Sequence, residues 1–280
     1  MSNKILIPKR QYFNKTHYTL DFENKVFIVN EDLLKTRQAN KPGTFNGFRK
    51  MTGSALGDIM GLGSFKSQFA AYARLCGFGM PVLDTKYIDA GVILEPKILD
   101  IVKKSLKRDL QTYPAKEYNY DYFKNNELFG GLPDGYCSDL NLVIEIKTAG
   151  RKKYDQWVEY GVDPSYIKQA QLYTYLMGSE KFSIVACFLE EDDYANPEAV
   201  DITKRIIKNW NFTINQEQVL DDIKFCTEWF EKYTNLGISP VWNDLIDGDL
   251  IEFLKCENQD QWEKLYLKWV EDKKAVPKVS

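Results

Sequence analysis

The chain has 280 residues, of which 44% are hydrophobic, and a formal net charge of -3. This length and composition are enough for a substantial core in one domain or two, and no stretch reaches the roughly 18 apolar residues that a membrane span needs. Residues 1–10 are too basic and too poor in apolar residues for a secretory signal, so we expect a cytoplasmic protein.

The cysteine and histidine content excludes several classes of site. The five cysteines are widely scattered and form no Cys-x-x-Cys pair, so they indicate neither a disulfide framework nor a zinc ribbon. The single histidine, His17, lies in a polar segment, which argues against a Ser/His/Asp hydrolase and against a histidine-bound metal. The chain also lacks a Gly-x-x-x-x-Gly-Lys-Ser/Thr loop, so it has no ATP-driven motor of its own.

Three regions follow one another along the chain. Residues 1–45 are mixed and polar and contain the breaker Lys41-Pro42-Gly43, so they predict an N-terminal arm or small addition. Helical and strand signals alternate over residues 46–242, which indicates a core of the α/β or α+β class. Residues 243–280 are rich in Trp and Lys and predict an amphipathic helical tail, packed on the core or on a partner; we expect the core.

Residues 129–149 have the character of a β-hairpin. Asp134 follows Pro133 at a turn, residues 138–141 have turn chemistry, and the apolar run 142–144 leads into Glu145-Ile146-Lys147 at a strand end. Because side chains alternate across a strand, Glu145 and Lys147 point to one face, and Ile144 and Ile146 point into the core. The hairpin brings Asp134 close to Glu145.

Two carboxylates that converge on one point repel each other unless a cation lies between them. Carboxylate oxygens suit Mg2+, which can activate water and polarise a phosphoryl oxygen. Lys147 beside the metal could orient or deprotonate the attacking water, or offset charge on the phosphate. The alternative is an ordinary solvated ion pair, because Glu-x-Lys also occurs elsewhere in the chain, at Glu23 for example.

A helix is predicted next, with Pro164 and Ser165 as start signals and Gly178 as a stop signal. Gln169 and Tyr173 are four residues apart and share a face of it. By itself this is also the pattern of an ordinary amphipathic helix. A strand is predicted over residues 182–189.

Together, these segments resemble the PD-(D/E)xK nuclease superfamily, in the branch of the YqaJ-type viral recombinases and lambda exonuclease. The matching segments are Met51–Phe69 for the opening helix and turn, Ala90–Pro96 for a Gly-x-x-x-Glu-Pro helix, Asp134 with Glu145 and Lys147, Gln169 with Tyr173, and Ile214–Pro240 for the closing helix. The resemblance implies a restriction-endonuclease-like core, in which helices flank a central mixed β-sheet.

The resemblance also implies roles for single residues. Glu95, Asp134 and Glu145 would hold the metal, together with the backbone carbonyl of Ile146. Lys147 would then serve the water.

The helix residues of the motif would have supporting roles. Gln169 would fix Lys147 or the nucleophile, and Tyr173 would support its helix or touch the scissile phosphate. Arg49, Lys50 and Ser54 would contact a 5'-phosphate, although the basic residue of lambda exonuclease lies further ahead of its Ser than these do.

Charge gives a mixed indication of DNA binding. A net charge of -3 is not typical of a nucleic-acid binder. Basic residues nevertheless cluster locally on the helix after Glu95 and at Arg151, Lys152 and Lys153, where they could grip phosphates or simply form solvated faces.

From these observations we expect a metal-dependent deoxyribonuclease. It would be a Mg2+-dependent exonuclease, with Mn2+ as a substitute, digesting linear duplex ends from 5' to 3' in phage-type recombination or DNA repair. The alternatives are a restriction-like endonuclease and a DNA-binding protein that has lost catalysis. The expected partner is DNA. The resemblance also implies a single-strand annealing protein and a homo-oligomer, specifically a trimer, because three subunits form a ring around DNA in the lambda exonuclease branch. Some RecB-like relatives hold an iron–sulfur cluster with late clustered cysteines, which are absent here, so no cluster is expected.

Overall fold

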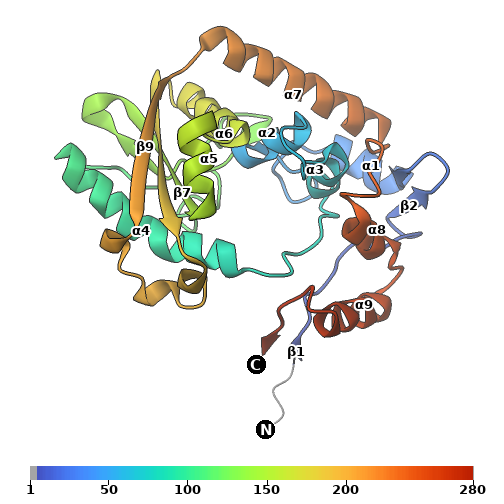
Figure 1. The fold of residues 1–280 in the computed structure, drawn as a ribbon. Coiled ribbons are helices and arrows are strands. Elements are labelled where there is room, and N and C mark those ends of the chain that lie inside the picture. The colour runs from blue at the N-terminus through green and yellow to red at the C-terminus, as the bar shows by residue number, and fades with distance from the viewer. Residues whose placement is uncertain (1–4, 280) are drawn as a thin grey trace. The chain divides into compact units, whose positions relative to one another are not determined.

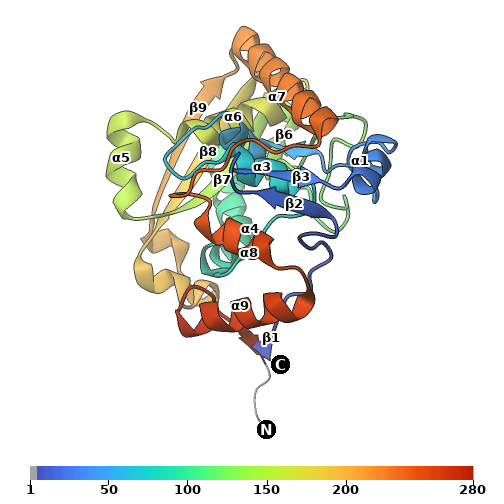
Figure 2. The ribbon, with the colours of Figure 1, turned by 90° about the vertical axis from the view of Figure 1, so that its right-hand side faces the viewer.

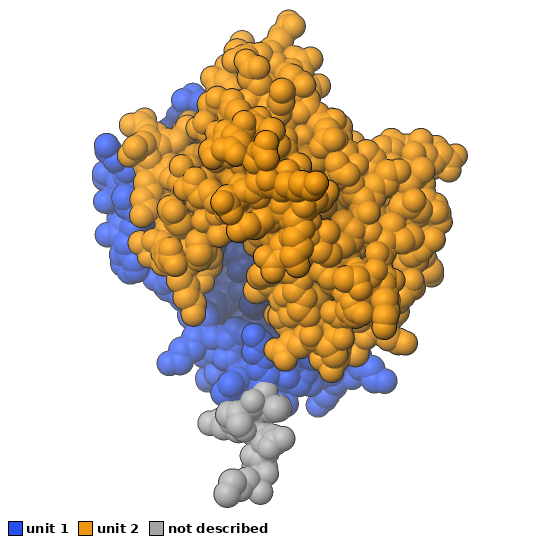
Figure 3. All heavy atoms as spheres, turned by 90° about the vertical axis from the view of Figure 1, so that its left-hand side faces the viewer, with its two compact units in different colours: residues 1–51, 58–85, 226–280 blue, residues 52–57, 86–225 orange. Residues whose placement is uncertain are grey.

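A computed structural model describes residues 5–279 of the chain. The chain divides into two compact units, which Figure 3 colours separately. Unit 1 comprises Met1–Met51, Asp58–Thr85 and Cys226–Ser280, and unit 2 comprises Thr52–Gly57 and Lys86–Phe225. These bounds differ from the expected ones at residues 45 and 242, because the N-terminal and C-terminal regions belong to the same unit.

Unit 2 is built on a mixed four-stranded sheet. Its strands are β6 (Gly135–Cys137), β7 (Leu142–Gly150), β8 (Lys181–Leu189) and β9 (Ile206–Thr213), in the order β6-β7-β8-β9. β6 and β9 run antiparallel to their neighbours, whereas β7 and β8 are parallel. A parallel pair needs a crossover connection, and two helices supply it.

Helices cover both faces of this sheet (Figures 1 and 2). On one face, α4 (Lys86–Leu106) forms an apolar cluster with strand residues that include Ile144 and Ile146. On the other face, α5 (Lys152–Tyr160) and α6 (Pro164–Leu176) pack against residues such as Val143 and Phe188. The expected α/β class with a central mixed sheet between helices is confirmed.

The crossover helix α6 has the predicted start and stop signals. Pro164 is its first residue, and the Asp163 side chain accepts a hydrogen bond from the Ser165 backbone N–H at 2.9 Å. The helix ends just before Gly178, whose φ of 67° is typical of a residue that follows a helix. These ends fix the register in which Gln169 and Tyr173 face the sheet.

Three features of the sheet region differ from the sequence-based expectation. β7 does not end at Lys147 but continues to Gly150, because these last residues pair in parallel with β8 up to Leu189. Residues 152–160, for which no helix was predicted, form α5, and the buried Trp157 packs it against the sheet. The edge strand β9 was not predicted.

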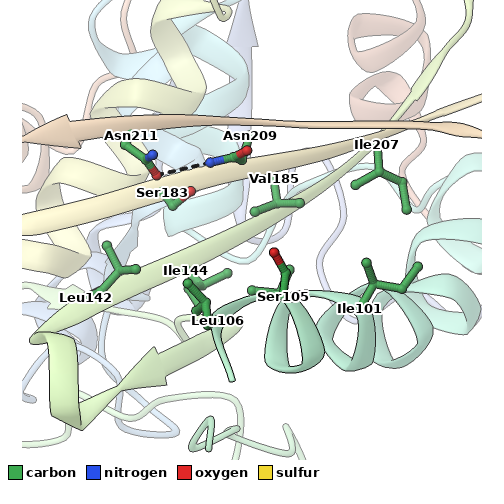
Figure 4. A pocket seen from close by; sticks show the side chains of 11 residues that line it. Ile101, Ser105, Leu106, Leu142, Ile144, Ser183, Val185, Ile207, Asn209 and Asn211 are labelled. Carbon is green, nitrogen blue, oxygen red and sulfur yellow. Dashed lines mark hydrogen bonds between the residues drawn. The ribbon is translucent and has the colours of Figure 1, made fainter. Parts of the chain in front are cut away.

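On its α4 side the sheet contains a pocket of about 290 Å³ (Figure 4). It lies where α4 faces β7, β8 and β9, and side chains such as Ile101 and Val185 line it. At its β9 edge the Asn209 amide donates a hydrogen bond to Asn211 at 3.3 Å. None of the three predicted carboxylates lines this pocket.

Unit 1 contains a short antiparallel hairpin, β2 (Tyr18–Asp21) and β3 (Val26–Val29), followed by α1 (Glu31–Gln38). The C-terminal residues form α8 (Gly248–Lys255) and α9 (Gln259–Glu271). Trp262 of α9 is buried against Phe253 of α8, with ring centroids 4.9 Å apart, and Trp269 donates a hydrogen bond to Glu252 at 3.2 Å. The predicted amphipathic tail is therefore helical and packs within unit 1.

The remaining helices and strands are β1 (Ile5–Leu6), β4 (Met51–Thr52), α2 (Gly53–Ile59), α3 (Gln68–Leu75), β5 (Phe129–Gly130), α7 (Gln216–Leu236) and β10 (Lys278–Val279). Short 3-10 turns cover Ser138–Leu140, Glu191–Tyr194, Pro197–Ala199 and Ile202–Lys204. Among residues 5–279, none of the helices combines the length and the apolar character that crossing a bilayer requires.

Candidate active site

Glu145 and Lys147 form a buried ion pair in the middle of β7. Their side chains are 1% and 15% exposed, and the Lys147 Nζ lies 2.5 Å from the Glu145 Oε1. Alternation along β7 places both on the sheet face that α6 covers, with Ile146 on the opposite face. The solvated surface pair that Glu-x-Lys alone allowed is therefore excluded.

The hairpin brings Asp134 to the same strand. The pairing of β6 with β7 ends at Gly135 and Ile144. The next backbone N–H of β7 that points toward the β6 edge belongs to Ile146, and it has no partner in β6. Instead, the Ile146 N–H donates a hydrogen bond to the Asp134 Oδ2 at 2.6 Å. In a strand the C=O of a residue faces the same edge as its N–H, so the Ile146 carbonyl also lies on the Asp134 side.

Glu95 joins the two other carboxylates from α4. Burial, followed by the negative charge of Asp134, raises the pKa of Glu95 to about 7. Burial and the charge of Asp134 likewise raise the pKa of Glu145 to about 8, with a smaller contribution from Glu95. The pKa of Asp134 is also raised, because it is buried. The three carboxylates thus lie close enough to act on one another's protonation.

Lys147 is the cation within this acidic cluster. Burial acts to lower its pKa, but the charges of Glu145 and Asp134 outweigh this and raise the pKa of Lys147 above its usual value. At neutral pH it is therefore a positive charge rather than a base in the chain alone. One lysine does not balance three carboxylates.

The donor set suits a hard divalent cation. The Glu145 Oε2 is buried without a hydrogen-bond partner, which is costly for a carboxylate oxygen. Carboxylate oxygens next to an unbalanced negative charge are the ligands that Mg2+ takes in proteins. Among residues 5–279, however, no three acidic, histidine or cysteine side chains are already arranged around a common metal position.

Gln169 connects α6 to the ion pair. Its Nε2 donates a hydrogen bond to the Glu145 Oε1 at 2.6 Å, and its Oε1 accepts one from the Lys147 Nζ at 3.4 Å. The amide can make both contacts because it carries a donor and an acceptor. Gln169 therefore fixes the orientation of Glu145 and Lys147 relative to each other.

Tyr173, one turn further along α6, has the contacts of a support. It is buried, stacks on Phe123 with ring centroids 5.6 Å apart, and accepts a hydrogen bond from the Gly53 N–H at 3.2 Å. Of the two roles that the resemblance implied, these contacts match the support of the helix.

Two glycines around Tyr173 were missed by the sequence analysis. A Cβ on Gly131, whose φ is 128°, would overlap with the Tyr173 hydroxyl. A Cβ on Gly53 would lie 2.8 Å from the Tyr173 ring and from the Gln169 side chain. The available signal was the Gly-Gly pair ahead of Pro133, which allows the chain a close approach that other residues cannot make.

Arg151, Lys152 and Lys153 lie beside this site, as their position after the strand suggested. They line a pocket of about 670 Å³ in unit 2, together with Tyr166 of α6. Tyr166 is also in contact with the Lys147 ammonium, which lies 4.8 Å from the centre of its ring. Tyr166 therefore links the predicted basic cluster to the ion pair, a role that the sequence did not indicate.

The residues predicted for a 5'-phosphate are divided between the two units. Ser54 belongs to unit 2, where its hydroxyl lies 2.9 Å from that of Thr52. Arg49 and Lys50 belong to unit 1, and the exposed Arg49 lines a pocket there.

Sequence relatives of the chain come from mycoplasmas. The chain is 27% identical over 283 residues to "Uncharacterized protein MG373" of Mycoplasma genitalium, covering 85% of this chain and 96% of that protein. It is 25% identical over 267 residues to the MG373 homolog of Mycoplasma pneumoniae, covering 80% and 92%. No protein-family model matches the chain.

Two solved structures share the fold. One is a phage-related exonuclease from Haemophilus somnus 129PT, with a TM-score of 0.50, 18% identity, and coverage of 67% of this chain and 94% of that chain. The other is LHK-Exo, the alkaline exonuclease from Laribacter hongkongensis, in complex with dAMP, with a TM-score of 0.50, 17% identity, and coverage of 81% and 95%. The fold implied by the resemblance to phage-type exonucleases is thus confirmed.

Proposed function

We propose that the chain is a metal-dependent deoxyribonuclease that digests linear duplex DNA from its ends. The observation that supports this most directly is the ion pair of Glu145 with Lys147, to both members of which Gln169 is hydrogen-bonded, with Asp134 and Glu95 close enough to act on it electrostatically. The fold shared with two exonucleases supports the same reaction class.

Glu95, Asp134, Glu145 and the Ile146 carbonyl are the groups that would hold Mg2+, or Mn2+ in its place. When bound, the ion would supply a positive charge to the phosphoryl oxygens and lower the pKa of water. The residues of the chain do the rest. Gln169 and Glu145 hold the Lys147 ammonium at a fixed point, where its charge orients a water for attack and offsets negative charge that develops on the phosphate.

The basic cluster next to the site fits a nucleic-acid substrate. Arg151, Lys152 and Lys153 line a pocket together with Tyr166, whose ring also contacts the Lys147 ammonium. Glu190 and Glu191 line the same pocket, so the three cations outnumber its acidic groups by one. Contacts of these side chains with phosphates would hold the DNA backbone against the site without reading its sequence. The 5'-to-3' direction, the roles of Arg49, Lys50 and Ser54 at a 5'-phosphate, and a place in recombination or repair beside an annealing protein are part of this proposal.

The test is cleavage of linear and closed circular duplex DNA with Mg2+, with Mn2+ and with EDTA. Degradation of linear DNA that needs Mg2+ or Mn2+ is the expected result. Asp134→Ala and Lys147→Ala should each lower the rate by at least about a hundredfold, because these groups act on the metal or the reacting phosphate. Equal degradation in EDTA, or full activity of either variant, would overturn the proposal.

A matched control separates the site from general charge effects. Lys124→Ala removes another lysine of unit 2, one that does not line the pocket formed by Arg151, Lys152 and Lys153. It should leave the rate within about twofold of the wild type. Nicking of closed circles with an intact active site would favour the endonuclease alternative.

A further inference from the structure

Unit 1 contains a pocket of about 240 Å³ that has a distinctly basic wall. It is formed by the N-terminal segment 8–12, the segment 77–81, and side chains of α8 and α9. The charged residues among those lining it are Lys9, Arg10 and Arg49, and no Asp or Glu lines it. In a chain with a net charge of -3, such a local excess of positive charge is unexpected.

The basic groups differ in what they already contact. Arg10 is tied into the unit: its guanidinium donates to the carbonyls of Tyr12 and Phe253 and to the Tyr18 hydroxyl, and it stacks 3.8 Å from the Phe253 ring centre. These partners are neutral, so the charge of Arg10 is not compensated. Lys9 and Arg49 are exposed, and their side chains form no hydrogen bond or ion pair within the described part of the chain.

A third arginine lies directly behind the wall of this pocket. Arg37 is 4% exposed, donates a single hydrogen bond, to the Gly47 carbonyl, and has a buried Nε without a partner. It lies close to the pocket lining, since a Cβ on Gly77 would be 3.5 Å from its Nη2. Its other neighbours are the rings of Tyr12, Phe48 and Phe78.

The positive charges of Arg10 and Arg37 also act on His17, another residue of unit 1. Burial lowers the pKa of His17, and the charges of Arg10 and Arg37 lower it further. A buried charge without a counter-ion is expensive, and among residues 5–279 no carboxylate pairs with any of the four basic residues. A bound anion would relieve this cost.

We propose that this pocket binds a phosphate group, either free or carried by a nucleic-acid strand. Arg49 and Lys9 supply the exposed donors, and Arg10 and Arg37 supply the fixed positive field behind them. A phosphate suits these donors because a guanidinium contacts two of its oxygens at once. Through Arg49 this inference rests in part on the proposed function, which gives the residue a contact with a 5'-phosphate. The pocket shares no residue with the carboxylate site of unit 2, so its binding can be measured without cleavage.

The test is binding to the full-length protein, in EDTA so that cleavage does not interfere. The probes are inorganic phosphate, pyrophosphate and a 5'-phosphorylated single-stranded oligonucleotide, each measured by calorimetry and by the shift in melting temperature. Chloride at matched ionic strength is the reference. We expect at least one phosphate probe to bind and to raise the melting temperature beyond the chloride reference.

Variants connect the binding to the pocket. Lys9→Gln combined with Arg49→Gln should weaken binding at least about tenfold, since each removes a hydrogen bond to a charged group. Lys264→Gln, at an exposed lysine of α9 outside the pocket, should leave it unchanged. Binding of phosphate and pyrophosphate identifies a free-phosphate site, and binding of the oligonucleotide alone identifies a strand site. No binding beyond chloride, or binding unchanged in the folded double variant, would overturn the proposal.

Discussion

At the scale of single residues, Lys147 cannot balance the negative charge that Glu95, Asp134 and Glu145 would carry if all three were ionised, so burial and mutual repulsion favour their protonated forms. In the folded chain the pKa of Glu145 is about 8 and that of Glu95 about 7, against 4.5 for an ordinary glutamate. The folded state therefore holds more protons than the unfolded state over this range. By linkage, the free energy of unfolding falls as pH rises from about 4.5 to about 8.

We expect this fall in EDTA and a smaller one with Mg2+, because a cation at the carboxylates favours their charged form. Melting curves from pH 5 to pH 8 measure it. Glu145→Gln cannot ionise and should flatten the dependence in EDTA, whereas Glu159→Gln, at an exposed residue of α5, should behave as the wild type. A wild type whose stability rises steadily over this range would contradict the charge balance described for the site.

Gly131 allows a sharp test of how Tyr173 is held. Gly131→Ala places a side chain at a φ of 128°, where residues other than glycine are strained, and pushes it into the Tyr173 hydroxyl. We expect the free energy of unfolding to fall by about 2 kcal/mol or more. Urea unfolding provides the measurement.

Gly150→Ala is the matched control, because its Cβ would meet no atom within 4 Å and its φ is not positive. It should change stability by less than about 0.5 kcal/mol. Equal losses in the two variants would mean that the contact with Tyr173 is not the cause.

The sequence predicted the residues of the site better than their contacts. Hairpin and strand signals were enough to bring Asp134 to Glu145, because the alternation and turn chemistry are local. The hydrogen bond from Ile146 to Asp134 was not predictable, since it arises from where the β6 ladder stops. The need for glycine at 131 depends on Tyr173, which is distant in sequence.

At the scale of elements, α6 is held to the N-terminal part of α7 by a buried ion pair. The Lys168 Nζ contacts both oxygens of Asp222, at 2.8 and 2.6 Å, and the side chains are 13% and 8% exposed. Removing one partner leaves an uncompensated charge in a poorly solvated position. The pair thus matters for the placement of the helix that carries Gln169.

We expect Asp222→Ala to lower the free energy of unfolding by about 3 kcal/mol or more. The double variant Lys168→Met with Asp222→Leu should recover most of this, because neither charge remains. A double-mutant cycle by urea unfolding measures the coupling. If the double variant is as unstable as the sum of the single ones, the ion pair is not what connects the helices.

Elements with strong local signals were predicted, and those stabilised by tertiary contacts were not. The helix at 164–176 has a proline start, a cap and a glycine stop. Arg151 occupies the N-cap position of α5, and Lys152 and Lys153 are its first two residues. Their positive charges oppose the helix dipole, so the packing of Trp157 stabilises the helix instead. β9 alternates exposed and half-buried residues, so its apolar content is too low for a clear strand signal.

At the scale of the whole molecule, the net charge of -3 conflicts with strong electrostatic binding of DNA. Two local groups of basic residues supply part of the positive charge that DNA binding needs. They are residues 151–153 in unit 2 and the pocket of Lys9, Arg10 and Arg49 in unit 1. An oligomer that surrounds the duplex would strengthen DNA binding further. Once one subunit is bound, the binding sites of the other subunits are held near the same DNA molecule at a high effective concentration. This is the physical reason to expect an oligomer, which the sequence only suggested through its resemblance to a ring-forming branch.

We therefore expect light scattering to give a homo-oligomer, with a trimer of the 32.5 kDa chain as the specific prediction. The same protein should digest 5'-phosphorylated linear duplex faster than hydroxyl-ended duplex and should leave closed circles intact. It should also complete the digestion of a molecule before starting another, since an enclosing ring dissociates slowly from its substrate. Quenching with excess unlabelled DNA after digestion begins measures this last property. A monomer that stops at once on quenching would contradict the ring, and a monomer that also nicks closed circles would identify the endonuclease instead.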